Sequence, residues 1–240
     1  MSELDSSRGT AAVPEQRGEA SPPAATSAGP PKPVVQEFLL IHDAMRHACG
    51  VLADSADRLR SGPTPQAKEL AAFASFLLDF VHHHHAGEDE HWWPALQAGS
   101  AAAGAVLAPL TDDHHELDPL LAALRGHAAA LRTGMHDVPA VRRDAAALRD
   151  HLLEHLAAEE PVLLPLLTEH LTDAEAERLG RLMAKTAPRK GLSYLLGSMD
   201  AAASLERQQA ILSKMPPPVR WLRPLMLRSY RRRVAVLVRA

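Results

Sequence analysis

Between residues 34 and 170, apolar side chains recur in alternating steps of three and four residues, the rhythm of helices that face a shared core. The pattern falls into four segments, residues 34–59, 66–96, 105–131 and 140–170. The breaks between them carry the Gly and Pro typical of helix connections, at 60–65, 97–104 and 132–139. Short connections favour antiparallel neighbours. The pattern therefore predicts an all-α, up-down-up-down four-helix bundle.

The two ends of the chain differ from this region. Residues 1–33 are rich in Pro, Ala, Ser and Gly, which predicts a disordered leader. Thr172 lies three residues before Glu175, the spacing of a capping box that starts a new helix. Further helices are expected near 189–198 and 201–214. We thus expect a leader (1–33), a bundle (34–171) and a helical C-terminal extension (172–240).

Charge is distributed unevenly along the chain. The net charge is -3, but residues 172–240 hold 14 Lys and Arg against 5 Asp and Glu, whereas residues 1–171 hold 12 against 24. In the extension, arginines alternate with apolar residues such as Trp221 and Leu225. We favour accessory helices whose apolar side chains pack on the bundle while their arginines face its acidic residues. A peripheral contact with a membrane or a protein is the alternative, and no specific nucleic acid is expected.

The cysteine content and the hydropathy of the chain indicate where in the cell the protein is located. Cys49 is the only cysteine, so no internal disulfide forms, and its seam position predicts a small buried core residue. No stretch approaches the roughly 20 apolar residues of a transmembrane helix, and the N-terminus has no signal-peptide core. These features predict a soluble, cytoplasmic protein.

A histidine interrupts the apolar seam of each of the four predicted helices. These residues are His42, His84, His114 and His155. In the second and fourth helices a glutamate follows one turn later on the same face, Glu88 and Glu159. The histidines are separated by 42 residues in the first half and by 41 in the second, so a two-helix unit occurs twice.

Burying these groups in a bundle is costly without a compensating charge. An ionised carboxylate in a core is expensive unless it is paired or bound to a metal. Two divalent or trivalent metal ions would compensate these buried histidines and glutamates. The glutamates would bridge the two ions, and the imidazoles would complete the coordination. Nitrogen and oxygen ligands of this kind suit iron or manganese. The sequence therefore predicts a dinuclear metal site inside the bundle.

The motifs HHAGEDEHWWPAL and HLAAEEPVLLPLL, each following an earlier histidine, resemble those of the hemerythrin-like (HHE cation-binding) domain family over about residues 36–170. The resemblance implies two iron ions, joined as an Fe-O-Fe or Fe-carboxylate-Fe centre, with manganese less favoured. His42 and His84 would hold one iron, His114 and His155 the other, and Glu88 and Glu159 would bridge them.

One position departs from the family pattern. Oxygen-carrying members have a second histidine one turn after the ligand of the third helix, where this chain has Asp118. Asp118 is open to three roles: ligand, hydrogen-bond partner of a ligand, or solvent-exposed residue. The remaining alternative ligands or neighbours are His85, His115, His151 and Glu160. Successive helical residues differ by about 100°, so His82 and His83 should point outward, and for His85 solvent is preferred over a place beside the site.

The resemblance implies binding of dioxygen or a related small oxidant, such as peroxide or nitric oxide, in sensing, scavenging or iron handling. A di-iron oxidase, oxygenase or peroxide-decomposing enzyme is the second hypothesis, because Asp118 would make the site richer in carboxylates. A metal store or an interaction module is the third. The sequence shows no polar groups that would select an organic substrate.

Overall fold

A computed structural model of the chain describes residues 32–204, 207–208, 215 and 217–239. Nearly all of the predicted leader, and most of the helix predicted over 201–214, lie outside these residues. Every regular element within the described residues is helical. The residues from Pro31 onward form one compact unit.

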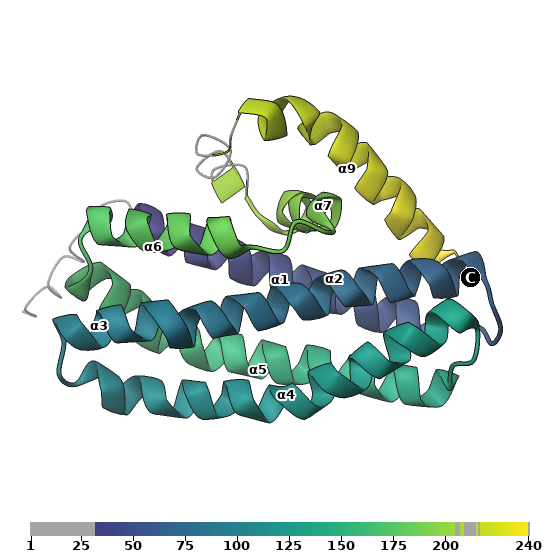
Figure 1. Ribbon diagram of the computed structural model, residues 1–240, viewed down its shortest axis with the longest axis horizontal. Helices are drawn as coiled ribbons and strands as arrows, with labels where there is room; N and C mark the ends of the chain where they lie inside the picture. Colours follow the sequence, from purple (N-terminus) through teal and green to yellow (C-terminus); the bar gives the residue numbers. More distant parts are fainter. Residues whose placement is uncertain (1–31, 205–206, 209–214, 216, 240) are drawn as a thin grey trace, which may run out of the picture. The chain divides into compact units, whose positions relative to one another are not determined.

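Four long helices form the bundle, and each lies beside two others of the set (Figure 1). The second helix does not stop where α2 ends, because a π-helical turn leads directly into α3. The elements are α1 (Pro33–Asp57), α2 (Pro65–Gly87), the π-turn η1 (Glu88–Trp92), α3 (Trp93–Gly99), α4 (Ala103–Thr133) and α5 (Val138–His170). This arrangement confirms the predicted four-helix bundle.

The helix ends fall where the sequence supplies capping residues. The Thr64 side chain accepts a hydrogen bond from the Ala67 amide at the start of α2, and Asp137 does the same for Ala140 at the start of α5. Gly134 ends α4 with a φ of 78°, a conformation that glycine adopts without strain. Local chemistry therefore sets the connections, as the breaks in the pattern predicted.

The bundle interior contains two apolar clusters. The larger cluster includes Met45, Leu77, Leu117 and Leu152, and it fills the end of the bundle near the α1–α2 and α4–α5 connections. The smaller cluster fills the other end, and its bundle members include Phe38, Trp92, Leu110 and Leu163. On each bundle helix the seam histidine lies between a residue of one cluster and a residue of the other. A layer of polar groups thus separates two hydrophobic cores.

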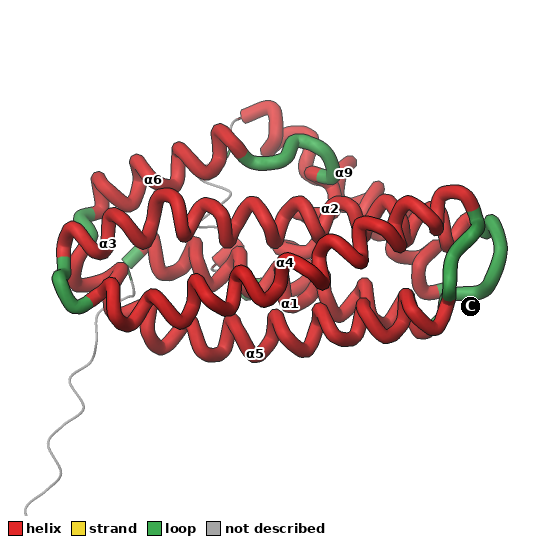
Figure 2. Tube along the Cα trace, turned by 60° about the horizontal axis from the view of Figure 1, so that its bottom comes forward, coloured by secondary structure: helices red, strands yellow, loops and turns green. Residues whose placement is uncertain are grey.

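The C-terminal helices pack mainly on α1 and α2. They are α6 (Asp173–Thr186), α7 (Leu192–Ala202) and α9 (Pro217–Val238), and Figures 1 and 2 show α6 and α9 on the outside of the bundle. The predicted capping box of Thr172 and Glu175 opens α6. Tyr194, Leu227 and Tyr230 join the larger apolar cluster.

Arginines of the extension meet acidic residues, as the packing interpretation expects. Arg233 pairs with Glu69 of α2 at 2.8 Å, and Arg207 pairs with Asp43 of α1. The outer face of α9 nevertheless leaves Trp221 80% exposed and Leu225 65% exposed. A membrane or protein contact through this face stays a prediction. Within the described residues, each helix is too short or too polar to span a bilayer.

Gly197 of α7 makes room for the ring of Tyr230, whose hydroxyl hydrogen-bonds to His47 of α1 at 2.8 Å. A Cβ at position 197 would occupy the space of that ring. We expect Gly197→Ala to lower the free energy of unfolding by about 1–3 kcal/mol, since overpacking would displace Tyr230 and with it α9. Urea unfolding followed by circular dichroism measures the change.

Gly126→Ala is the matched control, because Gly126 is an exposed residue of α4 with no neighbour near its would-be Cβ. This substitution should raise the free energy of unfolding by up to about 1 kcal/mol through helix propensity alone. Equal effects of the two substitutions would contradict the packing explanation.

Candidate metal centre

The six predicted ligands meet in the polar layer, and all of them are buried. Helix α1 supplies His42, α2 supplies His84, the π-turn supplies Glu88, α4 supplies His114, and α5 supplies His155 and Glu159. The side chains form two adjoining groups of metal-ligating composition. One is His42, His84, Glu88 and Glu159, and the other is His85, His114 and His155.

In the first group, the ligating atoms lie within 4.8 Å of one another. The Nε2 atoms of His42 and His84 are 3.2 Å apart. Two nitrogens bound to one ion at about 2.1 Å are separated by roughly 3.0–3.4 Å when they occupy neighbouring coordination positions. The two imidazoles therefore already have the spacing that a single metal ion requires.

The second group repeats this geometry. The Nε2 atoms of His114 and His155 are also 3.2 Å apart, and a ring nitrogen of His85 lies within 4.8 Å of both. The His85 ring stacks on that of His114, with centroids 4.3 Å apart and planes inclined by 9°. Three imidazoles from three elements, α2, α4 and α5, thus converge on a second position.

The two glutamates lie between these positions. Glu88 Oε1 is 3.0 Å from His84 Nε2, whereas its Oε2 is 3.7 Å from His114 Nε2, so its two oxygens face different groups. Glu159 Oε2 lies 3.6 Å from His42 Nε2 and 3.5 Å from His155 Nε2. This is the arrangement that two carboxylates need if they are to be shared by two ions.

The electrostatics of the layer also favour a cation. Burial raises the pKa of Glu88 and of Glu159 well above the usual value, and it lowers the pKa of His84 and of His155 to about 3. Within the described residues, no donor group of another side chain or of the backbone hydrogen-bonds to the four carboxylate oxygens of the two glutamates. A positive ion would supply the partner that these oxygens lack.

A second pair of carboxylates orients two of the imidazoles. Asp89, next to Glu88, accepts a hydrogen bond from His114 Nδ1 at 3.0 Å. Glu160, next to Glu159, accepts one from His42 Nδ1 at 2.9 Å and pairs with Arg46 at 2.8 Å. Each half of the repeat therefore fixes a histidine of the other half, with Nε2 turned toward the site.

These contacts settle the placement of Glu160 and reveal one residue that sequence reasoning missed. Glu160, predicted as an alternative to Glu159, belongs to neither group and lies behind His42. Asp89 was not predicted, although its position after Glu88 matches that of Glu160 after Glu159. The repeat was the signal that could have identified it.

Three of the remaining candidates lie away from the layer. Asp118 and His115 are exposed, His151 is half-buried, and none of them belongs to either group. Of the three roles open to Asp118, the structure shows the exposed one. His82 is exposed as predicted, and the half-buried His83 lies 3.1 Å from the Met183 carbonyl of α6.

The preference for a solvent-facing His85 was wrong, because its side chain is only 4% exposed. Helix α2 packs against both α1 and α4, so its inward face spans more than one residue of each turn. A step of about 100° turns His84 toward His42 of α1 and His85 toward His114 of α4. A single apolar stripe read from the sequence marks one residue of each turn, so it does not include the second inward-facing residue, His85.

Aromatic side chains close the layer toward the smaller cluster. Trp92 and Trp93 are buried in and just after the π-turn, next to Pro94. Trp92 packs edge-on against Phe38 with centroids 4.7 Å apart, and Trp93 lies parallel to His114 at 6.2 Å. Single π-turns inside α-helices are frequent at functional sites, and this one begins at Glu88.

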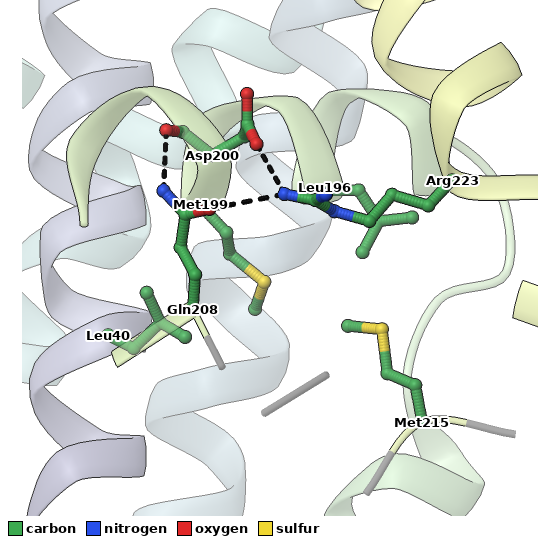
Figure 3. Close-up of a pocket in the computed structure, with 7 residues that line it drawn as sticks. All are labelled: Leu40, Leu196, Met199, Asp200, Gln208, Met215 and Arg223. Carbon is green, nitrogen blue, oxygen red and sulfur yellow. Dashed lines mark hydrogen bonds and ion pairs between the residues drawn. The ribbon is translucent and has the colours of Figure 1, made fainter. Parts of the chain in front are cut away.

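A pocket lies apart from this layer, between α1, α7 and α9 (Figure 3). Its polar groups pair with one another: Arg223 donates to Asp200 and Gln208, and Gln208 donates to the Asp200 carbonyl. It therefore presents mostly apolar walls and satisfied polar groups, and it contains none of the residues of the two groups.

Fold and site together define a four-helix-bundle protein with a buried histidine–glutamate cluster suited to metal binding. The model of the hemerythrin HHE cation binding domain matches residues 34–167, more than half of the chain, so the chain belongs to this family. Comparison with curated proteins and with solved structures finds no match.

Replacing one shared carboxylate should separate metal binding from folding. We expect Glu159→Met to lose most bound metal, yet to raise the free energy of unfolding of the metal-free protein by about 1–4 kcal/mol, because an unpaired buried carboxyl gives way to an apolar group of similar size. Metal content by mass spectrometry and urea unfolding of the metal-free protein test the two effects.

His84→Ala should also lose metal, whereas His83→Ala should retain it, because the His83 ring belongs to neither group. Equal loss of metal in His83→Ala would show that the assignment of faces on α2 is wrong.

Asp89→Asn and Glu160→Gln test the carboxylates behind the imidazoles. Each substitution should weaken metal affinity about 10–100-fold, because the imidazole it contacts loses its fixed orientation and part of its basicity. Competition with a chromophoric chelator measures the affinity. Glu154→Gln, at an exposed position of α5, should leave affinity unchanged. If Glu154→Gln weakens metal affinity as much as the other two substitutions, the loss comes from the change in net charge and not from the lost contacts with the imidazoles.

Proposed function

We propose that the bundle holds a dinuclear non-haem iron centre that binds dioxygen or a related small oxidant, such as peroxide or nitric oxide. His42 and His84 hold one ion, His114 and His155 hold the other, and Glu88 and Glu159 are shared. The observation that carries this proposal is the placement of Glu88, whose two oxygens face different histidine pairs at 3.0 and 3.7 Å. Nitrogen and carboxylate donors in this ratio suit iron, with manganese less favoured.

When bound, iron supplies a reversible change of oxidation state and open positions for small ligands. The protein residues supply the surroundings. Asp89 and Glu160 accept hydrogen bonds from His114 Nδ1 and His42 Nδ1, which keeps both Nε2 atoms directed at the ions. Phe38, Trp92 and Trp93 line one side of the layer with apolar rings. These features fit an oxidant that is small and uncharged.

Sensing, scavenging or iron handling is the role that we propose for such binding. The enzyme hypothesis rested on Asp118 as an extra carboxylate, and Asp118 is exposed. The additional side chain in the layer is instead the imidazole of His85. We therefore retain oxidant binding as the proposed function. A cytoplasmic location stays a prediction.

Metal analysis of the purified protein tests the proposal directly. We expect about two irons per chain, one for each group of ligands, together with a near-ultraviolet absorption band typical of bridged ferric pairs. Zinc as the sole metal, or no metal at all, would contradict the proposal.

Addition of oxidant to the anaerobically reduced protein tests the role. Stoichiometric spectral change that reverses when the oxidant is removed supports a sensor or carrier. Continuous consumption of peroxide or dioxygen would instead favour the enzyme. Glu159→Met, which should lack the metal, is the control for oxidant consumption by the polypeptide.

A further inference from the structure

His85 is the one buried histidine that the internal repeat does not account for. Five histidines are buried within the described residues, and four of them correspond in pairs, His42 with His114 and His84 with His155. The counterpart of His85 in the second half is Leu156, which is fully buried in the larger apolar cluster. The fold therefore accepts an apolar side chain at this point of the repeat, and the first half has an imidazole there instead.

The surroundings of His85 do not satisfy its ring. The Nε2 atom is buried and has no hydrogen-bond partner among the residues that the structure describes. Its nearest rings are those of His114, stacked at 4.3 Å, and His155, edge-on at 4.9 Å. An unpaired polar atom in a core costs free energy that a leucine would not cost. A structural role alone gives no reason for an imidazole here.

A metal ion would remove this cost, because a neutral imidazole nitrogen is a good metal ligand. A ring nitrogen of His85 lies within 4.8 Å of the ligating atoms of both His114 and His155. The Nε2 atoms of these two histidines are themselves 3.2 Å apart. The three rings thus approach one position from α2, α4 and α5.

We propose that His85 is a ligand of the metal ion held by His114 and His155. The centre then has unequal halves: three histidines at one position and two at the other, with Glu88 and Glu159 between them. This inference rests on the proposed dinuclear centre and adds a residue to it. A direct consequence is that the two ions bind with different affinities, and that the three-histidine position depends on His85.

His85→Leu is the decisive variant, since it copies the residue that the repeat places at the equivalent position. Anaerobic titration of metal-free protein with Fe²⁺, and separately with Co²⁺ as a spectroscopic probe, should give two bound ions per chain in the unsubstituted protein. In His85→Leu we expect one of the two ions to bind about 100-fold more weakly or not at all. Removing a direct ligand should lower the metal affinity more than removing a residue that only orients a ligand.

Three comparisons keep the test specific. Metal-free His85→Leu should unfold at a temperature no lower than that of the metal-free unsubstituted protein, since leucine relieves the unpaired nitrogen. His85→Gln keeps a polar side chain at this position. If His85 has a merely structural role, this variant should bind metal as the unsubstituted protein does. If His85 is a ligand, the variant should bind metal more weakly and show an altered Co²⁺ absorption spectrum. His83→Leu, on the same helix but outside both groups, should bind both ions normally.

Retention of both ions with unchanged affinity in His85→Leu or His85→Gln would overturn the inference and leave the dinuclear centre intact. Failure of the unsubstituted protein to bind two ions would instead overturn the proposed function itself. The two failures are therefore distinguishable in one set of titrations.

Discussion

The interaction on which the rest of the structure depends is the contact of two buried carboxylates with four buried imidazoles in the middle of the bundle. Glu88 and Glu159 are 0% exposed, and within the part of the chain that the structure describes no other group donates a hydrogen bond to their oxygens. Apolar clusters lie on both sides of this layer and enclose the carboxylates. Burying these carboxylates therefore costs free energy of folding, and a bound cation would offset that cost.

The internal repeat explains how the site is kept in shape. Each half contributes a shared glutamate followed by a second carboxylate, Glu88–Asp89 and Glu159–Glu160. The second carboxylate holds an imidazole of the opposite half, so each half positions the other across the bundle. This exchange ties the ligand geometry to the packing of all four helices. A shift of one helix pair against the other would misplace one ligand in each group.

Much of this was predictable from the sequence, because the information is local or periodic. Steps of three and four residues located the bundle helices, and capping residues such as Thr64 and Asp137 located their starts. The spacing of His84 to Glu88 and of His155 to Glu159 placed those side chains on common faces. His85 escaped prediction because its burial depends on how α2 contacts α4 as well as α1, which is a property of tertiary packing. Asp118 could not be placed for the same reason.

The C-terminal helices add an asymmetry that the repeat alone would not produce. Helices α6, α7 and α9 pack mainly on α1 and α2, and Met183 of α6 fills the space that Gly87 leaves beside Glu88. The covered pair of helices, with the π-turn that continues α2, carries His42, His84, His85 and Glu88, the half of the site in which the repeat is broken. The extension therefore gives these helices packing contacts that the bundle alone does not supply. The extension thus covers the helices that carry the unmatched histidine of the repeat, while the contact of α2 with α4 turns that histidine inward.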